Sequence, residues 1–413
     1  MKDFLKYLSR IFVGLTFIFS GFVKAVDPFG GAVKFQDYFI AFGFEWLTSI
    51  ALPLSFLLII FEFALGFYLV FGIYVRQTSL VAFLTMSFFT ILTLILAIFN
   101  PVTDCGCFGD AIILTNWQTF WKNIVIILPT IHLFLNRDKF VKIENKLFKY
   151  FVIITPVIYI LTLSIYSHRH LPILDFRPYK IGVNLADGMS IPDDAAQPEY
   201  ETLFTLSKDG IEQIFKIEEY PYDDSTWVFV SSDTKLISEG YTPPLNDFSV
   251  LNRYQDDFTS EIANSEGSQI VLLSPDINKI SAKLAYNIFE LSESSKEQNI
   301  PFRFITSSSL EEIEKFENSS NIVIDDYLFA DEVTIKTIIR SNPGLLVIHD
   351  GTIVGKYHFN DFPTTEIMKN PLAFSLTNDK TRTNKTIIWM HIFALLFIST
   401  IIINLFKTIK TTK

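Results

Sequence analysis

The sequence predicts an α-helical membrane bundle joined to an α/β domain that lies outside the membrane. Two observations favour this fold class. Hydrophobic residues make up 49% of the 413-residue chain, which includes 42 phenylalanines, and they gather into long stretches. These stretches approach the roughly 20 apolar residues that cross a bilayer as a helix. A polar block separates the last two stretches and is long enough for one or two domains.

Six membrane spans are expected. Their ranges are 5–26, 47–73, 78–99, 118–135, 150–167 and 386–406. The first four would form one helical bundle, and the last two are further spans. The first stretch is predicted to be a retained span rather than a signal peptide, because its apolar run is long and no small-residue cleavage site follows. After it, residues 27–31 predict a turn and residues 32–42 a short amphipathic helix at the membrane surface.

Basic residues predict the orientation of these spans. Lys and Arg occur near the N-terminus, as the single Arg76 after the second span, as a cluster after the fourth span and in the C-terminal tail. All four segments fall on one side of a six-span arrangement, and residues 100–117 on the other side contain neither residue type. Because cytoplasmic loops carry an excess of Lys and Arg, we expect both termini in the cytoplasm and residues 168–384 outside.

The external block is acidic. Residues 168–384 contain 18 Lys and Arg against 35 Asp and Glu, a charge of −17, and the remaining 16 basic and 9 acidic residues bring the chain to −10. An acidic external domain does not suit nucleic-acid binding. The expected partner of the remaining chain is the lipid bilayer.

The two cysteines of the chain lie one residue apart, as Cys105 and Cys107, in the polar loop between the third and fourth spans. Thiols in a Cys-Gly-Cys sequence cannot avoid each other. They could form a redox couple, a structural disulfide, a site for Cu(I) or Zn with His168 and His170, or remain inert. A disulfide in so short a ring would stabilise the fold little, which favours redox exchange.

The surroundings of the thiols bear on this choice, because thiolate attack requires a lowered pKa. Asp104 and Asp110 flank the pair and are expected to raise the thiol pKa. The nearest cation in the sequence is Lys122 in the next span. Quinone-coupled thiol oxidases that relay electrons through two cysteine pairs need more cysteines than this chain has. Either the loop contacts a quinone directly, or an outside thiol protein completes the relay.

Glu62 is the carboxylate predicted deepest in a span. A carboxylate at mid-membrane is costly and is therefore a functional candidate, either as a proton carrier or as a quinone-binding group. It could equally be a protonated acid that hydrogen-bonds a neighbouring helix, through Thr16, Ser20 or Thr93. Lys24, near the outer end of the first span, is expected to extend towards the membrane surface.

Several segments of the first 135 residues resemble the MauE/DoxX-like membrane proteins. These segments are Arg10–Gly14, Phe19–Lys24, Asp27-Pro28, Glu62 with Gly66 and Gly72, and Cys105-Gly106-Cys107-Phe108-Gly109. The last of them matches the CGCFG signature of the MauE branch. The resemblance implies a four-helix bundle and a redox-associated membrane protein, linked to disulfide formation in exported proteins. The whole architecture resembles an uncharacterised Bacteroidota group, which implies a bacterial inner membrane and a periplasmic external block.

The external block divides into two parts. Residues 168–267 are expected to be a linker with a β-rich segment, in which Asp209-Gly210 predicts a hairpin between two alternating strands. From residue 268 strands and helices alternate: strands at 269–274, 302–306, 345–348 and 352–358, and helices at 277–298, 310–316 and 331–340, with a further strand at 321–324.

This order resembles the thioredoxin fold over residues 268–372. Asn342-Pro343 stands where that fold places its cis-proline. The position of the thioredoxin active site, residues 274–279, contains no cysteine. The resemblance therefore implies a binding module without thiol exchange of its own.

The predicted organisation follows from these observations. Its parts are a MauE/DoxX-like bundle (1–135), a basic loop and fifth span (136–167), an external linker and β-rich segment (168–267), a thioredoxin-like domain without a CxxC motif (268–372), and a linker, sixth span and cytoplasmic tail (373–413). The leading function is thiol–disulfide redox support of exported proteins, with Cys105, Cys107 and Glu62 as site residues and a periplasmic thiol protein as partner. A quinone is a possible cofactor. The alternative is a non-enzymatic membrane scaffold or assembly factor.

Overall fold

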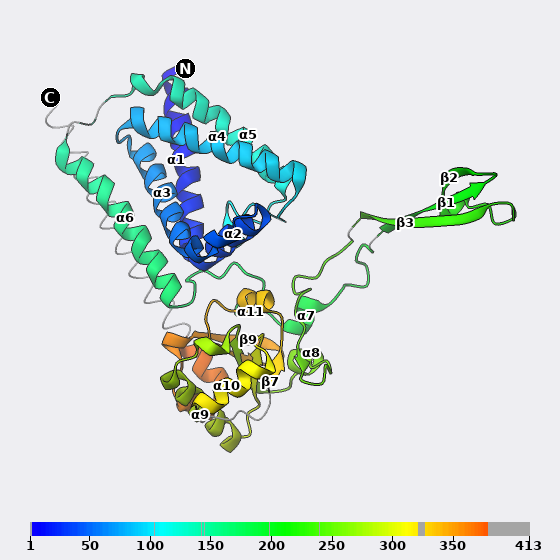
Figure 1. Ribbon diagram of the computed structural model, residues 1–413. Helices are drawn as coiled ribbons and strands as arrows, with labels where there is room; N and C mark the ends of the chain where they lie inside the picture. The colour runs from blue at the N-terminus through cyan, green and yellow to red at the C-terminus, as the bar shows by residue number, and fades with distance from the viewer. Residues whose placement is uncertain are drawn as a thin grey trace.

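The computed structural model describes residues 2–378, apart from 103, 142, 144, 198, 239 and 321–326. The described chain has a helical part and, below it in Figure 1, a mixed α/β part. The predicted span at 386–406 lies outside the described residues. So does the predicted strand at 321–324.

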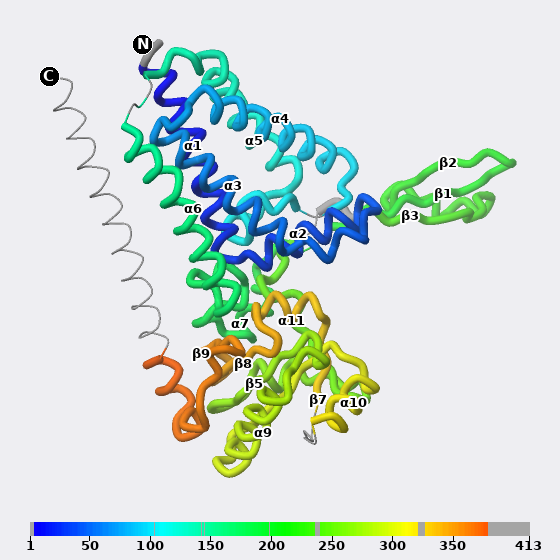
Figure 2. The backbone as a smooth tube through the Cα atoms, turned by 60° about the vertical axis from the view of Figure 1, so that its left-hand side comes forward, coloured from blue at the N-terminus to red at the C-terminus, as the bar shows by residue number. Residues whose placement is uncertain are grey.

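The helical part is built from α1 to α6. Their bounds are α1 Lys2–Val26, α2 Pro28–Ala41, α3 Ala51–Phe71, α4 Val75–Phe99, α5 Asn116–Leu135 and α6 Lys146–Arg169. Helices α1, α3 and α6 run side by side, while α4 and α5 form a second packed layer that leans away from α3 (Figures 1 and 2). Helix α2 lies across the end of the bundle that faces the α/β part (Figure 1).

Four helical segments in the described chain are long and apolar enough to cross a membrane: Phe4–Val26, Glu45–Phe71, Val75–Phe99 and Lys146–Arg169. They coincide with the first, second, third and fifth predicted spans. The fourth predicted span forms α5, but its composition is less apolar because Gln118, Lys122 and Asn123 lie in its first half. The structure thus supports four apolar helices, and the predicted count of six stays a prediction.

Helices α1 and α3 approach closely because glycines face each other at their crossing. A Cβ atom on Gly66 would lie 2.5 Å from the carbonyl oxygen of Gly14. Small residues of this kind let two helix backbones approach within a membrane, where packing rather than hydrophobic burial drives association. This crossing brings the polar residues of α1 next to Glu62 on α3.

The predicted turn at 27–31 is wrong, because α2 begins at Pro28. Asp27 caps the helix by accepting a hydrogen bond from the Gly30 backbone N–H at 3.0 Å, and Pro28 occupies the first helical position. Proline suits that position since its missing N–H would be unpaired there. The predicted short helix at 32–42 is confirmed as part of α2.

The α/β part contains a six-stranded sheet. Its strands are β4 Leu251–Asn252, β5 Ser268–Ser274, β6 Phe302–Thr306, β7 Tyr327–Phe329, β8 Gly344–His349 and β9 Thr352–His358, in the order β4-β7-β6-β5-β8-β9. Strands β5, β6 and β7 are parallel, and β8 and β9 are antiparallel additions. The predicted strands at 269–274, 302–306, 345–348 and 352–358 are therefore confirmed.

Helices cover both faces of this sheet. They are α8 Thr259–Ala263, α9 Ala282–Glu297, α10 Leu310–Ser320 and α11 Glu332–Ile338. Alternate residues of β5 enter two separate cores: Ile270 and Leu272 pack on the α9 side, and Val271 and Leu273 on the α11 side. The predicted helix at 277–298 starts later than expected, since Ser281 caps α9 and residues 277–279 form a 3₁₀ turn.

A separate three-stranded sheet projects from the linker. It contains β1 Glu199–Lys208, β2 Ile211–Lys216 and β3 Val228–Ser238, in the order β2-β1-β3. The predicted hairpin is confirmed, because Asp209 and Gly210 both have positive φ, as a tight hairpin turn requires. The sheet stands apart from the helices and from the larger sheet in Figure 1.

Candidate functional site

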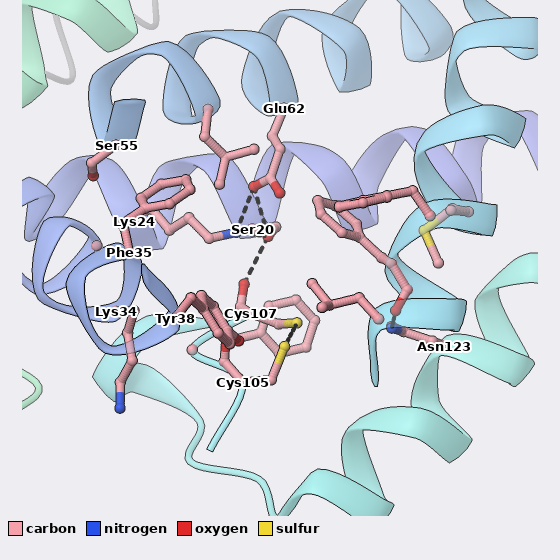
Figure 3. Close-up of a pocket in the computed structure, with 18 of the residues that line it drawn as sticks. Ser20, Lys24, Lys34, Phe35, Tyr38, Ser55, Glu62, Cys105, Cys107 and Asn123 are labelled. Atoms are coloured by element: carbon pink, nitrogen blue, oxygen red, sulfur yellow. Dashed lines mark hydrogen bonds and ion pairs between the residues drawn. The ribbon is translucent and has the colours of Figure 1, made fainter. Parts of the chain in front are cut away.

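The three residues predicted to carry function lie around one cavity. Cys105, Cys107 and Glu62 all line a space of about 370 Å³ that is enclosed by α1 to α5 and the loop between α4 and α5. Figure 3 shows Glu62 on α3 pointing towards the cysteine loop, with Ser20 and Lys24 of α1 between them. The sequence identified these residues separately, and it gave no reason to place Glu62 beside the cysteines.

The cysteine loop is bent so that both thiols face the same space. Gly106 has φ +64°, a backbone conformation that favours glycine, and its N–H donates to Asp104 Oδ1 at 2.9 Å. The two Sγ atoms are 2.8 Å apart and are not bonded. The hydroxyl of Tyr38 on α2 donates to the Cys105 carbonyl at 2.7 Å, which ties the loop to the helix.

The two thiols have different acidities. The hydrogen bond from Cys105, helped by the charges of Lys122 and Lys24, lowers the pKa of the Cys107 thiol to about 6 despite burial, which raises it. The same contact with Cys107, together with burial, raises the pKa of Cys105. Cys107 is therefore the more acidic thiol of the pair.

The expectation that acidic neighbours would dominate the thiols needs correction. Asp104 is held by Lys34 of α2, whose Nζ lies 2.7 Å from its carboxylate. Lys122 instead reaches over the ring of Phe108, 4.2 Å from its centre, and acts on Cys107. The loop contains no cation, but α1 and α5 supply cations from the flanking helices.

Glu62 has two close partners on α1. Its side chain is 1% exposed, and its Oε2 lies 2.7 Å from Lys24 Nζ and 2.9 Å from Ser20 Oγ. The hydroxyl of Ser20 also lies 2.8 Å from the carbonyl oxygen of Cys107. A polar chain thus links the acid in α3 to the backbone of the cysteine loop.

Two expectations about this region can now be judged. Ser20 is confirmed as a partner of Glu62, whereas Thr93 accepts a hydrogen bond from Asn123 at 3.1 Å instead. The prediction that Lys24 extends to the membrane surface is wrong, since Lys24 is 9% exposed and turns inward. The Lys24 ammonium pairs with the buried carboxylate of Glu62, and this pairing offsets part of the desolvation that each charge undergoes on burial.

The histidines proposed as metal ligands lie elsewhere. His168 packs against the ring of Phe56, and Nδ1 of His170 lies 2.8 Å from Asp361 in the α/β part. No group of three or more His, Cys, Asp or Glu side chains suited to a metal ion is present among the described residues. The part of the chain that the structure describes therefore offers a Cu(I) or Zn ion no histidine beside the two thiols.

A second, polar cavity of about 440 Å³ lies on the other side of the cysteine loop. Here Arg340 of the α/β part reaches the membrane part: its Nε is 2.9 Å from Asp27, and its Nη2 is 3.6 Å from Asp110. Burial would raise the pKa of Asp27, but Arg340 and Arg177 lower it below its usual value. Asp27 is thus held as a carboxylate at the contact between the two parts.

Sequence reasoning missed two residues of the site. Lys122 was identified as the nearest cation to the thiols, because it is a lysine in an otherwise apolar helix, but Tyr38 and Arg340 were not singled out. Nothing in the sequence linked Arg340 to Asp27, 313 positions away.

Comparisons with known proteins agree with the helical part. The family model described as methylamine utilisation protein MauE matches residues 2–135, which include α1 to α5 and the cysteine loop. A second model, described as a domain of unknown function (DUF8463), matches residues 200–239, the projecting three-stranded sheet. No curated protein matches the chain. Residues 2–135 are therefore MauE-like and include apolar helices long enough to cross a membrane, and the C-terminal region contains β-sheets.

Proposed function

We propose that this protein supports thiol–disulfide redox chemistry of exported proteins through Cys105 and Cys107. The observation that carries the proposal is the pair itself: two thiols 2.8 Å apart in a loop whose glycine has a positive φ, with nearby cations that lower the pKa of one of them. A lowered pKa and an adjacent second thiol are what disulfide exchange requires.

The exchange balances with these residues alone and a client protein. The Cys107 thiolate attacks one sulfur of a client disulfide, the client S–S bond breaks, and a client thiolate leaves. Cys105 then attacks the Cys107 sulfur, which forms the Cys105–Cys107 disulfide and releases a reduced client. The reverse sequence moves a disulfide from the pair into the client.

The orientation in this proposal is a bacterial inner-membrane protein with residues 168–384 in the periplasm and both termini in the cytoplasm. The positive-inside pattern supports it. Basic loops also meet at one end of the bundle, where Arg76 lies 3.1 Å from Asp138 and Lys149 lies over the ring of Tyr74. The cysteine loop, α2 and the α/β part occupy the opposite end (Figure 1).

We further infer a thioredoxin-like fold for residues 268–372. Support comes from the adjacent order β9-β8-β5-β6, with β5 and β6 parallel and β8 antiparallel to β5. The Asn342–Pro343 bond is cis, as the sequence predicted. Asn342 bridges the corner, since its Oδ1 accepts from Ser274 Oγ at 2.7 Å and its Nδ2 donates to the Asp276 carbonyl at 2.8 Å.

The role proposed for this corner is partner recruitment. Where a thioredoxin carries its cysteines, this chain has Pro275 and Asp276. Both residues line a cleft of about 930 Å³ that also includes Gln36 of α2 and Asn360 near β9. A protein bound in this cleft would contact the α/β part and the membrane part together.

Cysteine trapping tests the proposal. With Cys105→Ser, a mixed disulfide formed at Cys107 cannot be resolved, so a periplasmic thiol protein should remain attached and appear on non-reducing gels. Cys107→Ser is the matched control and should capture much less, because it removes the lower-pKa thiol. Failure of both variants to capture any thiol protein would contradict the redox function.

The second candidate is a non-enzymatic scaffold or assembly factor. The projecting sheet favours it, because Ile211, Val228 and Phe229 are exposed on an element that packs on neither part. An unchanged phenotype in the double variant Cys105→Ser, Cys107→Ser would support this candidate over the first.

A further inference from the structure

The cysteine loop separates two cavities of opposite character. Gly106 lines both the inner cavity beside Glu62 and the outer cavity beside Arg340. The two cysteines line the inner cavity, and neither is among the described residues around the outer one. Both thiols therefore face the interior of the helical bundle rather than the polar cleft against the α/β part.

The inner cavity is walled mainly by aromatic and aliphatic side chains. Its apolar wall is formed by residues of α2, α3 and α4 and by the residue that follows α2, and it includes Phe35, Phe39, Phe42, Leu58, Phe88 and Leu92. Phe42 is 41% exposed and Phe88 is 61% exposed, so the wall continues to the outer surface of the helices. Because α4 is long and apolar enough to cross a membrane, its exposed face at Phe88 would lie against the bilayer.

Polar groups concentrate at the closed end of the cavity. Lys24 and Glu62 form their ion pair there, and Asn123 and Lys122 lie on the α5 side. Among the described residues, Lys122 has no carboxylate within ion-pair distance, and its ammonium lies over the Phe108 ring. Hydrogen-bond donors and two thiols thus meet at the end of an apolar passage from the membrane.

We propose that this cavity binds a lipid-soluble quinone, which oxidises the Cys105–Cys107 dithiol. The inference rests on the proposed function and names the electron acceptor for it. Two S–H bonds break, one S–S bond forms, and the two electrons and two protons convert the quinone into the hydroquinone. The oxidised pair then passes its disulfide to a client dithiol, which returns Cys105 and Cys107 to thiols.

The chemistry of the cavity favours a quinone over other apolar occupants. A quinone ring stacks on aromatic side chains, and its carbonyl oxygens accept hydrogen bonds from donors such as an ammonium or an amide. A volume of about 370 Å³ falls within the range of roughly 300–1,000 Å³ typical of small-molecule sites. A lipid acyl chain would fill the apolar wall, but it has no acceptor for the polar end.

The number and position of the cysteines also favour a quinone as the electron acceptor. With two cysteines in the whole sequence, no second pair can carry electrons away from the loop. The position of both thiols on the apolar cavity makes direct transfer to a membrane-soluble acceptor the shortest route. Glu62, at the same end, can accept and pass on a proton released during oxidation.

The test uses the full chain, reduced and placed in lipid nanodiscs without oxygen. Decylubiquinone is added, its reduction is followed by ultraviolet absorbance, and the loss of free thiols is measured in parallel. We expect equal amounts of quinone reduced and dithiol lost, and no quinone reduction in the double variant Cys105→Ser, Cys107→Ser.

A matched pair of variants on α4 locates the site. Leu92→Trp places a large ring in the cavity and should weaken decylubiquinone binding by about tenfold or more, since overpacking a filled space is costly. Ile91→Trp adds the same ring at a neighbouring position that is 62% exposed and does not line the cavity, so binding should stay within about twofold. Equal effects of both substitutions would overturn the assignment of the cavity.

An azido-quinone provides a second measurement that does not depend on a substituted protein. Photolysis with the wild-type chain should label peptides from α2 and α4, and decylubiquinone should compete for the label. If lipid retained in the cavity is not displaced and no label enters these peptides, the quinone site is wrong. If the pair exchanges with a dithiol peptide but is not oxidised by quinone, the quinone inference fails while the proposed function stands. If it does neither, the proposed function itself fails.

Discussion

Separating Lys24 from Glu62 should destabilise the helical part in a way that a double substitution reverses. Glu62 is 1% exposed and Lys24 is 9% exposed, so either charge left alone is desolvated without compensation. Removing one partner of a buried ion pair typically costs about 3–5 kcal/mol, whereas replacing both with uncharged residues of similar size is often nearly neutral. Lys24→Met strands the carboxylate of Glu62, apart from its contact with Ser20.

The two single substitutions are not expected to lower the free energy of unfolding equally. In Glu62→Gln the amide can still accept a hydrogen bond from Lys24 and Ser20, and Lys24 sits one turn or so from the end of α1, where it can move towards water. We therefore expect about 1–2 kcal/mol for Glu62→Gln and about 3 kcal/mol or more for Lys24→Met. The double variant should recover most of this loss, which gives a coupling energy of about 2–3 kcal/mol.

Unfolding of the purified protein in detergent micelles, followed by helical circular dichroism, measures this cycle. The variant Ser87→Ala is a suitable control, because Ser87 donates to the Phe83 carbonyl within α4 and is remote in sequence from both charges. Additive effects of the two single substitutions would refute the ion pair as a stabilising unit. Full stability of Glu62→Gln combined with loss of thiol chemistry would instead assign Glu62 a role in the reaction.

Three further predictions concern the thiols and the α/β part. After mild reduction, a charged, membrane-impermeant maleimide should label the cysteines in intact spheroplasts. This labelling should be slower than that by neutral N-ethylmaleimide, because the thiols face an apolar cavity. Labelling only after permeabilisation would overturn the predicted orientation. The rate of Cys107 alkylation should be half-maximal near pH 6. The variant Cys105→Ala should move this midpoint towards the usual cysteine pKa of about 8.5, because the hydrogen bond from Cys105 is lost. A midpoint that does not move would show that this hydrogen bond does not set the pKa of Cys107. Pro343→Ala or Asp276→Lys should weaken capture of the partner by Cys105→Ser without changing the alkylation rate of the thiols, and undiminished capture by both would remove the recruitment role.

Sequence reasoning worked best where a local pattern decides the structure. Long apolar runs predicted α1, α3, α4 and α6, and alternation of apolar residues predicted the strands of the larger sheet. The Cys-Gly-Cys sequence identified its own site, since two thiols this close in sequence must be close in space. The depth of Glu62 in an apolar run marked it as unusual for the same local reason.

The rest depended on contacts that no local pattern encodes. Lys24 could extend to the membrane surface or turn inward, and the position of Glu62 on another helix decided between them. The start of α2 was mistaken for a turn because Pro28, Gly30 and Gly31 are turn-forming residues, and only the cap by Asp27 shows that a helix begins there. The pKa of Cys107 is lowered first by its hydrogen bond with Cys105 and then by Lys122 and Lys24, which belong to α5 and α1 and which no pattern in the loop sequence points to.

The position of Arg340 has a thermodynamic consequence for the whole molecule. Its backbone stands two residues before Asn342–Pro343, and its side chain holds both Asp27 at the end of α1 and Asp110 in the loop that carries the cysteines. A ligand at the Pro343 corner and a change of bonding at Cys105–Cys107 would both occur close to this contact, and under the proposed function we expect the two events to be coupled through it. Linkage is reciprocal, so if oxidation of the pair changes the affinity of the corner for a client by some factor, binding of that client must change the equilibrium for oxidation by the same factor. The affinity of the Pro343 corner for a client would then differ between the oxidised and the reduced state of the cysteine pair.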